Sequence, residues 1–104
     1  MIRRSQVWNR GVWMAKRVKL DARLDSAAAD RLRAQLKESA DSDLTLDGTA
    51  VEMLGGLCLE LLLSARSLWS ARARAFAVDA PSAAMIDDLT RYGLTPAALA
   101  GDPA

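Results

Sequence analysis

The chain has 104 residues, 51% of them hydrophobic, and a formal net charge of +1, which fits one globular domain. It contains no histidine and one cysteine, Cys58, so an internal disulfide, a histidine-based catalytic triad and a histidine-ligated metal are excluded. Because a lone cysteine is typical of a reducing compartment and no apolar run reaches the ~20 residues of a membrane-spanning helix, we expect a cytoplasmic protein.

The first part of the chain is basic. Six basic residues precede the first acidic one, Asp21, whereas acidic residues outnumber basic ones in the rest of the chain. A basic arm can bind nucleic acid, and Trp8 and Trp13 supply aromatic rings on which bases stack. The basic residues are scattered and follow no helical face, so a solvated extension is the simpler interpretation. Nucleic-acid binding stays open as the alternative function of a different class.

Residues 18–24 alternate apolar and polar side chains, which predicts a half-buried strand. Asp25 and Ser26 then offer N-cap oxygens for a helix that runs to Ser39. Residues 39–43 are polar and predict a turn. The face of the helix that is expected in the core carries Ala28, Ala29, Leu32, Gln35 and Leu36.

Residues 44–46 predict a short buried strand that ends before an acidic turn. A helix is expected over residues 55–70, and its start is apolar almost all round, which indicates burial. Cys58 lies in its first turn, where the helix dipole could make a thiol reactive, but a buried, inert thiol is the simpler interpretation. The leucines expected in the core are Leu57, Leu61 and Leu62.

Residues 73–78 predict a third strand. Pro81 and Ser82 open a further helix, with Ser82 as its N-cap. Gly93 stands where the residue after a helix adopts the left-handed conformation, with Leu94 as its hydrophobic partner. The apolar stripe of this helix consists of Met85, Ile86, Leu89 and Tyr92. Its solvated face is expected to carry Asp87, Asp88 and Arg91.

The repeated order of strand and helix predicts an α/β domain in which right-handed crossovers join the parallel strands. We assign residues 16–100 to this domain. Residues 1–15 are expected to be a basic extension or an edge strand, and residues 101–104 a frayed tail.

The segment of residues 44–63 has the most informative pattern, because a short strand leads through an acidic turn to a helix that begins with two glycines. The other segments that matter are Leu24-Asp25-Ser26 and residues 79–94, which close with Tyr92-Gly93-Leu94. Their order over residues 16–95 resembles the STAS family (sulphate transporter and anti-sigma factor antagonist domains). The resemblance implies an α/β fold with a small mixed β-sheet covered mainly on one face by helices. It also implies a docking module without catalytic activity, cofactor or metal, and the sequence contains no catalytic motif.

In phosphorylatable members of that family, a Ser or Thr at the start of this helix is the regulatory switch. The corresponding position here is Gly56 or Leu57, and neither side chain can be phosphorylated. The chain is most similar to small stand-alone STAS proteins of alphaproteobacterial chemotaxis operons, which implies constitutive binding to a chemotaxis histidine kinase. Docking on the ATPase of a phospholipid-trafficking ABC transporter and a role as an anti-sigma factor antagonist stay open, as does homo-oligomerisation.

The resemblance implies a partner-binding surface around the start of the second predicted helix. Glu52 and Met53 are the expected exposed contacts, and Gly55 and Gly56 would permit a close approach of the partner. The alternative is that these glycines permit close approach between helix and sheet within the fold. The partner-binding residues are expected to be Asp47, Glu52, Met53, Gly55, Gly56 and Trp69.

Two of these residues have a second interpretation. Asp47 could act as a general base or metal ligand, but a side chain that caps the following turn is the simpler interpretation. Trp69 lies near three arginines in the sequence, as interface anchors often do, or else it closes the core as an amphipathic aromatic residue. Both interpretations of Trp69 stay open.

Overall fold

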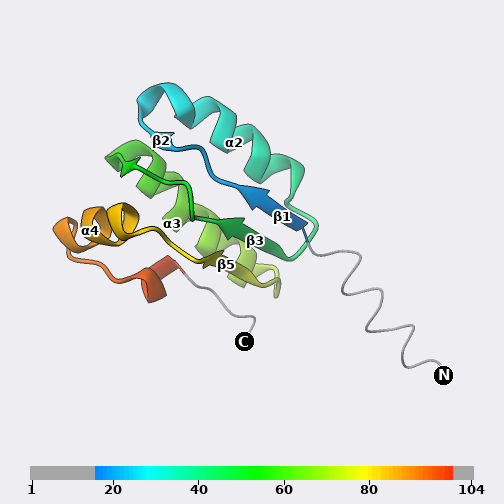
Figure 1. Ribbon diagram of the computed structural model, residues 1–104. Helices are drawn as coiled ribbons and strands as arrows, with labels where there is room; N and C mark the ends of the chain where they lie inside the picture. Colours follow the sequence, from blue (N-terminus) through cyan, green and yellow to red (C-terminus); the bar gives the residue numbers. More distant parts are fainter. Residues whose placement is uncertain (1–15, 100–104) are drawn as a thin grey trace.

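A computed structural model describes residues 16–99 of the chain (Figure 1). The predicted extension and tail therefore lie outside the described residues. The strands are β1 (Lys16–Lys19), β2 (Arg23–Leu24), β3 (Leu44–Asp47), β4 (Met53–Leu54) and β5 (Phe76–Asp79). The helices are α2 (Ala29–Glu38), α3 (Gly56–Ala71) and α4 (Ala83–Arg91), with the short 3-10 helices η1 (Ser26–Ala28) and η2 (Pro96–Leu99).

The described strands form two parallel sheets. β3 lies between β1 and β5 in a three-stranded sheet, and β2 pairs with β4 in a two-stranded one. The predicted α/β class is confirmed. The mixed sheet implied by the family resemblance is not found in residues 16–99, where every strand pair is parallel. Within the same residues, no helix is long and apolar enough to cross a membrane.

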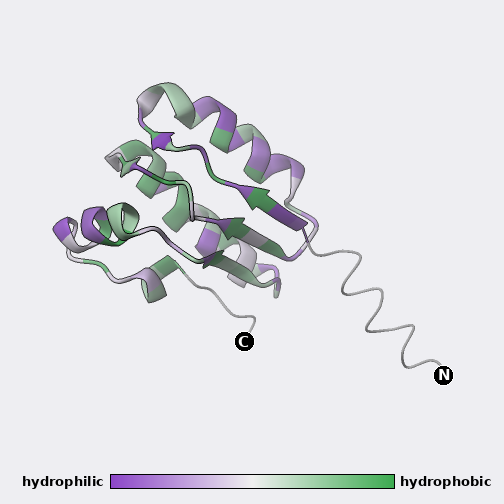
Figure 2. Cartoon of the chain, in the orientation of Figure 1, coloured by the Kyte–Doolittle hydropathy of each residue, from purple (hydrophilic) through white to green (hydrophobic). Residues whose placement is uncertain are grey.

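The three-stranded sheet has one buried and one open face. Leu44, Leu46 and Phe76 are almost fully buried on the first face. Arg17 and Asp79 are exposed on the other face, because successive side chains of a strand point to opposite sides. Figure 1 shows α2 and α3 behind the sheet, and Figure 2 shows hydrophobic residues along β3 and β5 and hydrophilic ones over much of α2.

The strand predicted over residues 18–24 is divided in two. β1 pairs with β3 and ends at Lys19, whereas β2 pairs with β4. Leu20 and Leu24 are both buried, so the alternation correctly predicts which side chains face the core. It does not predict that the two halves pair with different strands, because side-chain alternation carries no information about the neighbouring strand.

The predicted cap of the first helix is confirmed, since the Asp25 carboxylate accepts a hydrogen bond from the Ala28 N–H over 3.1 Å. The first turn is the 3-10 helix η1, and α2 then buries the expected face through Ala29, Leu32 and Leu36. These contacts anchor α2 beside α3, so that the two helices lie next to each other over the sheet.

The end of α3 differs from the sequence prediction because a tight turn replaces the beginning of the expected strand. Ala73 adopts a positive φ of 57°, and the Arg74 N–H donates to the Trp69 carbonyl over 2.9 Å. β5 consequently begins at Phe76, three residues later than the predicted strand over residues 73–78.

Both predicted ends of α4 are confirmed. The Ser82 hydroxyl accepts a hydrogen bond from the Met85 N–H, and Gly93 has a positive φ of 78° while the Leu94 N–H donates to the Leu89 carbonyl. The predicted apolar stripe is only partly correct. Met85 and Leu89 are buried, but the other two members of the stripe are exposed. The core covers only the side of this short helix on which Met85 and Leu89 lie. The exposed residues are Ile86 and Tyr92.

Candidate functional site

The start of α3 is held close to β2 by the backbone of Gly55. The Gly55 N–H donates to the Leu24 carbonyl over 2.8 Å. A Cβ atom at this position would lie 3.1 Å from the same carbonyl oxygen, which is tighter than ordinary van der Waals contact. Close approach at Gly55 therefore occurs within the fold. As the N-cap residue, Gly55 also leaves α3 without a side-chain cap.

Gly56 has a different environment. It is exposed, and the nearest atom to an added Cβ would be the Tyr92 hydroxyl at 3.6 Å, an ordinary contact distance. Tyr92, at the end of α4, is itself 47% exposed. The fold thus requires a glycine at position 55 for space, whereas position 56 is open toward solvent and toward an exposed aromatic ring.

Leu57 corrects a prediction from the sequence. It was expected in the core, but it is 45% exposed. The core side of the first two turns of α3 is occupied by Cys58, Leu59 and Leu62, all buried. Only about half of a helix surface can face a single sheet, so Leu57 lies on the outer side although its neighbours in the sequence are apolar.

A hollow of about 470 Å³ lies between the start of α3 and the end of α4. Its residues are Met53, Leu54, Gly55, Asp88, Arg91 and Tyr92. Glu52 precedes this hollow in the sequence and is exposed, as expected, whereas Met53 is half-buried rather than exposed. We call the set formed by Glu52, Met53, Gly55, Gly56, Leu57 and Tyr92 the α3-start surface.

Asp88 is a structural residue that the sequence analysis placed on a solvated face. Its carboxylate accepts a hydrogen bond from the Leu54 N–H over 2.8 Å and another from the Arg91 guanidinium over 3.0 Å. The side chain is only 17% exposed. Asp88 therefore joins α4 to β4 beneath the hollow. No local signal could have found this contact, because 34 positions separate its partners.

Asp47 is not among the residues that line the hollow. Its Oδ1 atom accepts hydrogen bonds from the Thr49 N–H over 2.9 Å and from the Thr49 hydroxyl over 2.7 Å. These bonds, aided by the charges of Arg17 and Lys19 and partly offset by desolvation, hold the pKa of Asp47 below its usual value. The turn-capping interpretation is confirmed. Arg17 also links Asp47, at 3.8 Å, to Asp79, at 2.8 Å.

Trp69 closes the core and is not an exposed anchor. It is 2% exposed, its indole N–H donates to the Ser42 carbonyl over 2.7 Å, and its ring centre lies 5.6 Å from that of Phe76. The ring is held by α3, β5 and the turn after α2, so it fixes the relative position of these elements. A direct role in partner binding through an exposed Trp69 is therefore wrong.

Cys58 is buried, as expected. Its thiol donates to the Asp25 carbonyl over 3.3 Å. Burial, together with the negative charges of Asp25 and Asp21, raises the pKa of the thiol, so the reactive thiolate is disfavoured. Within residues 16–99, no group of three or more Cys, Asp or Glu side chains is arranged to hold a metal ion.

The arrangement at the start of α3 can support binding of another molecule. The α3-start surface combines exposed apolar groups, an acidic side chain and a helix start without a side-chain cap. No protein-family model, no curated protein and no solved structure matches the chain.

Proposed function

We propose that the protein is a non-catalytic STAS-type adaptor that binds a bacterial signalling protein through the α3-start surface. A chemotaxis histidine kinase in the cytoplasm is the partner that the sequence resemblance favours. The observation that carries the proposal is the exposure of two large side chains, Leu57, which follows Gly56 in the chain, and Tyr92, whose hydroxyl would be the nearest neighbour of a Cβ atom at Gly56. Exposed leucine and tyrosine side chains next to a hollow are typical of protein interfaces.

The chemistry of this surface supports docking in two ways. Leu57 and Tyr92 offer apolar area, and Tyr is one of the residues enriched among those that contribute most to binding. Glu52 and Arg91 add charges of opposite sign around it, which can orient a partner. The uncapped first turn of α3 also presents backbone N–H groups and the positive end of the helix dipole, which favour a carboxylate of the partner.

The binding is proposed to be constitutive. Gly56 or Leu57 occupies the position of the family's phosphorylated residue, so no hydroxyl is present there to receive a phosphate. A phosphate at a helix start would add charge that can break an interface. Its absence leaves the apolar surface permanently available, as an adaptor without a switch requires.

The test is affinity capture from the native cytoplasm with the full chain, followed by titration against the purified partner. Capture is repeated with Glu52→Lys and Gly56→Arg, both at exposed positions. Matched controls are Glu38→Lys and Ala97→Arg, which make similar changes at exposed positions outside the surface. We expect wild type and controls to bind a histidine kinase, and each surface variant to bind about tenfold more weakly or not at all.

Other captured partners discriminate among the alternatives. A transporter ATPase or an anti-sigma factor, captured by wild type and lost in the same two variants, would replace the kinase but keep the surface. A kinase that binds all variants equally would refute the surface assignment. Nucleic acid that is released by salt, with no protein partner, would refute the adaptor proposal in favour of the basic arm.

A further inference from the structure

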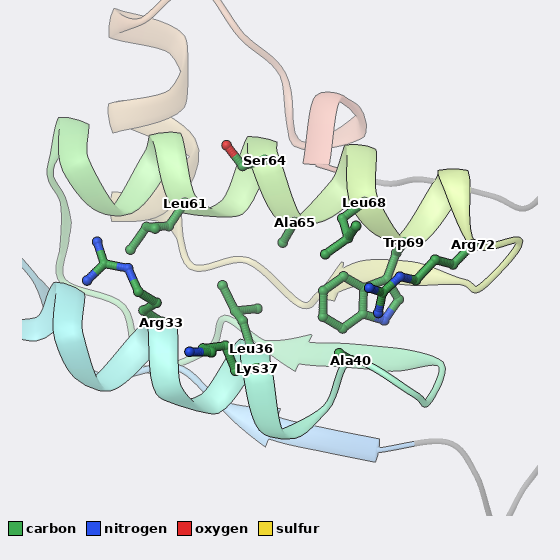
Figure 3. A pocket seen from close by; sticks show the side chains of 10 residues that line it. All are labelled: Arg33, Leu36, Lys37, Ala40, Leu61, Ser64, Ala65, Leu68, Trp69 and Arg72. Atoms are coloured by element: carbon green, nitrogen blue, oxygen red, sulfur yellow. The ribbon is translucent and has the colours of Figure 1, made fainter.

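A second hollow, of about 380 Å³, runs between α2 and α3 (Figure 3). We call it the α2–α3 groove. The groove shares no residue with the α3-start surface, so binding in the groove can be tested independently of the proposed function. Its lining comes from α2 and the turn after it, and from α3 and its C-cap.

The floor of the groove is apolar. Leu36 and Ala65 are buried, Leu61 is half-buried, and Trp69 closes one end. Leu68, beside Trp69, is 43% exposed although it is a large aliphatic side chain. An apolar floor of this kind favours a ligand with an apolar side, because covering Leu68 and Leu61 removes hydrocarbon surface from water.

The rim of the groove is cationic. Arg33, Lys37 and Arg72 line it, and no acidic side chain does. Arg33 pairs with Asp30 over 3.0 Å, but within residues 16–99 Lys37 and Arg72 have no carboxylate within salt-bridge distance. The charge of the groove is therefore complementary to an acidic ligand, which gains favourable interactions on approach and docking.

The placement of the cations selects among acidic ligands. Figure 3 shows Arg33 near Leu61 at one end of the groove and Arg72 near Trp69 at the other. Along α3, Leu61 and Arg72 are separated by about 16 Å, or roughly three helical turns. A single-headed anionic amphiphile would contact the cations of one end only. A helix of about three turns with carboxylates along its flanks would reach all three cations.

We propose that the α2–α3 groove docks an acidic amphipathic helix of a partner protein. The apolar side of that helix, with residues at i, i+3 or i+4 and i+7, would cover Leu61 and Leu68, in the usual mode of a helix in a groove. Its Glu or Asp side chains would face Arg33 and Lys37 on α2 and Arg72 beyond α3. The docked helix would lie over the line of contact between α2 and α3.

The probe is a phage-displayed library of helical peptides of about 15 residues, with leucines at the amphipathic positions and flanks randomised among Glu, Gln and Lys. Selection is performed on the full chain and on the double variant Lys37→Glu, Arg72→Glu, both at exposed positions. We expect the wild-type chain to enrich Glu on both flanks. The double variant should lose that preference and bind the selected peptide about tenfold more weakly.

Leu68→Glu should also weaken the selected peptide about tenfold. The matched control is Ile86→Glu, which makes the same kind of change at an exposed aliphatic residue of α4, outside both the groove and the α3-start surface. Lys19→Glu, Arg23→Glu is the corresponding control for charge reversal at exposed positions. Both controls should keep wild-type affinity, and circular dichroism checks that every variant is folded.

Several results would overturn the proposal. They are the absence of enriched peptides, an enrichment of Lys or Gln on the flanks, and an equal loss of affinity in Ile86→Glu and Leu68→Glu. Anionic phospholipid vesicles or a single-stranded oligonucleotide that displace the selected peptide and bind more tightly would also overturn it, because the groove would then serve a lipid surface or a nucleic acid.

Discussion

Replacing Asp88 by alanine tests the contact that positions α4 against β4. The substitution removes the acceptor of the Leu54 N–H, a hydrogen bond of 2.8 Å, and the side chain is 17% exposed, so water replaces the carboxylate only in part. A hydrogen bond to a charged group contributes about 1.5–3 kcal/mol, and the partial access of water places the expected loss near 1.5 kcal/mol. The ion pair with Arg91 adds little, because that side chain is 78% exposed.

The free energy of unfolding is measured by urea titration with circular dichroism. Asp87→Ala is the matched control, because it removes a carboxylate from the adjacent, exposed position and should change stability by less than about 0.5 kcal/mol. Asp88→Asn should lie between the two, since an amide oxygen can still accept the Leu54 N–H without the charge. Equal stabilities of Asp88→Ala and Asp87→Ala would refute the structural role of Asp88.

Four other positions give further predictions. Gly55→Ala should lower the unfolding free energy by about 1 kcal/mol, because its Cβ would lie 3.1 Å from the Leu24 carbonyl oxygen. Gly56→Ala should instead raise the unfolding free energy by up to about 0.5 kcal/mol. Urea titration measures the sign of each change in unfolding free energy. The Cys58 thiol should react with a disulfide reagent in urea but not in the folded protein, as followed by absorbance; fast native reaction would contradict its burial. The lowered pKa of Asp47 means that the ionised group stabilises the fold above its unfolded value near 3.8, and this contribution is lost as the pH falls through the folded pKa. Asp47→Asn should therefore show a smaller loss of stability than wild type between about pH 5 and pH 2; identical profiles would exclude this contribution.

The proposed surfaces differ in how far the sequence could reveal them. The resemblance to STAS domains pointed to the start of α3, where Gly56 is open to solvent and Glu52 is exposed as expected, whereas Met53 is half-buried. It also included Trp69, which is buried, and it missed Tyr92, which was expected in an apolar stripe. The α2–α3 groove was not predicted, because its residues come from two helices whose mutual position depends on the sheet beneath them.

The sequence by itself determined the features that depend on near neighbours in the chain. The Asp25 and Ser82 caps each act within three residues, and the left-handed Gly93 reflects a backbone preference of that residue. Periodicity likewise predicted buried side chains such as Leu20 and Leu24, because alternation assigns a face to each position.

The tertiary structure alone decided which of the apolar faces are covered and which distant groups meet. Leu57 and Leu62 are both apolar residues of one helix, yet only Leu62 is buried, since the sheet covers one side of α3. The Asp88 carboxylate meets the Leu54 N–H across 34 positions. Such contacts depend on strand pairing and helix packing across the whole domain, and no local pattern of residues encodes them.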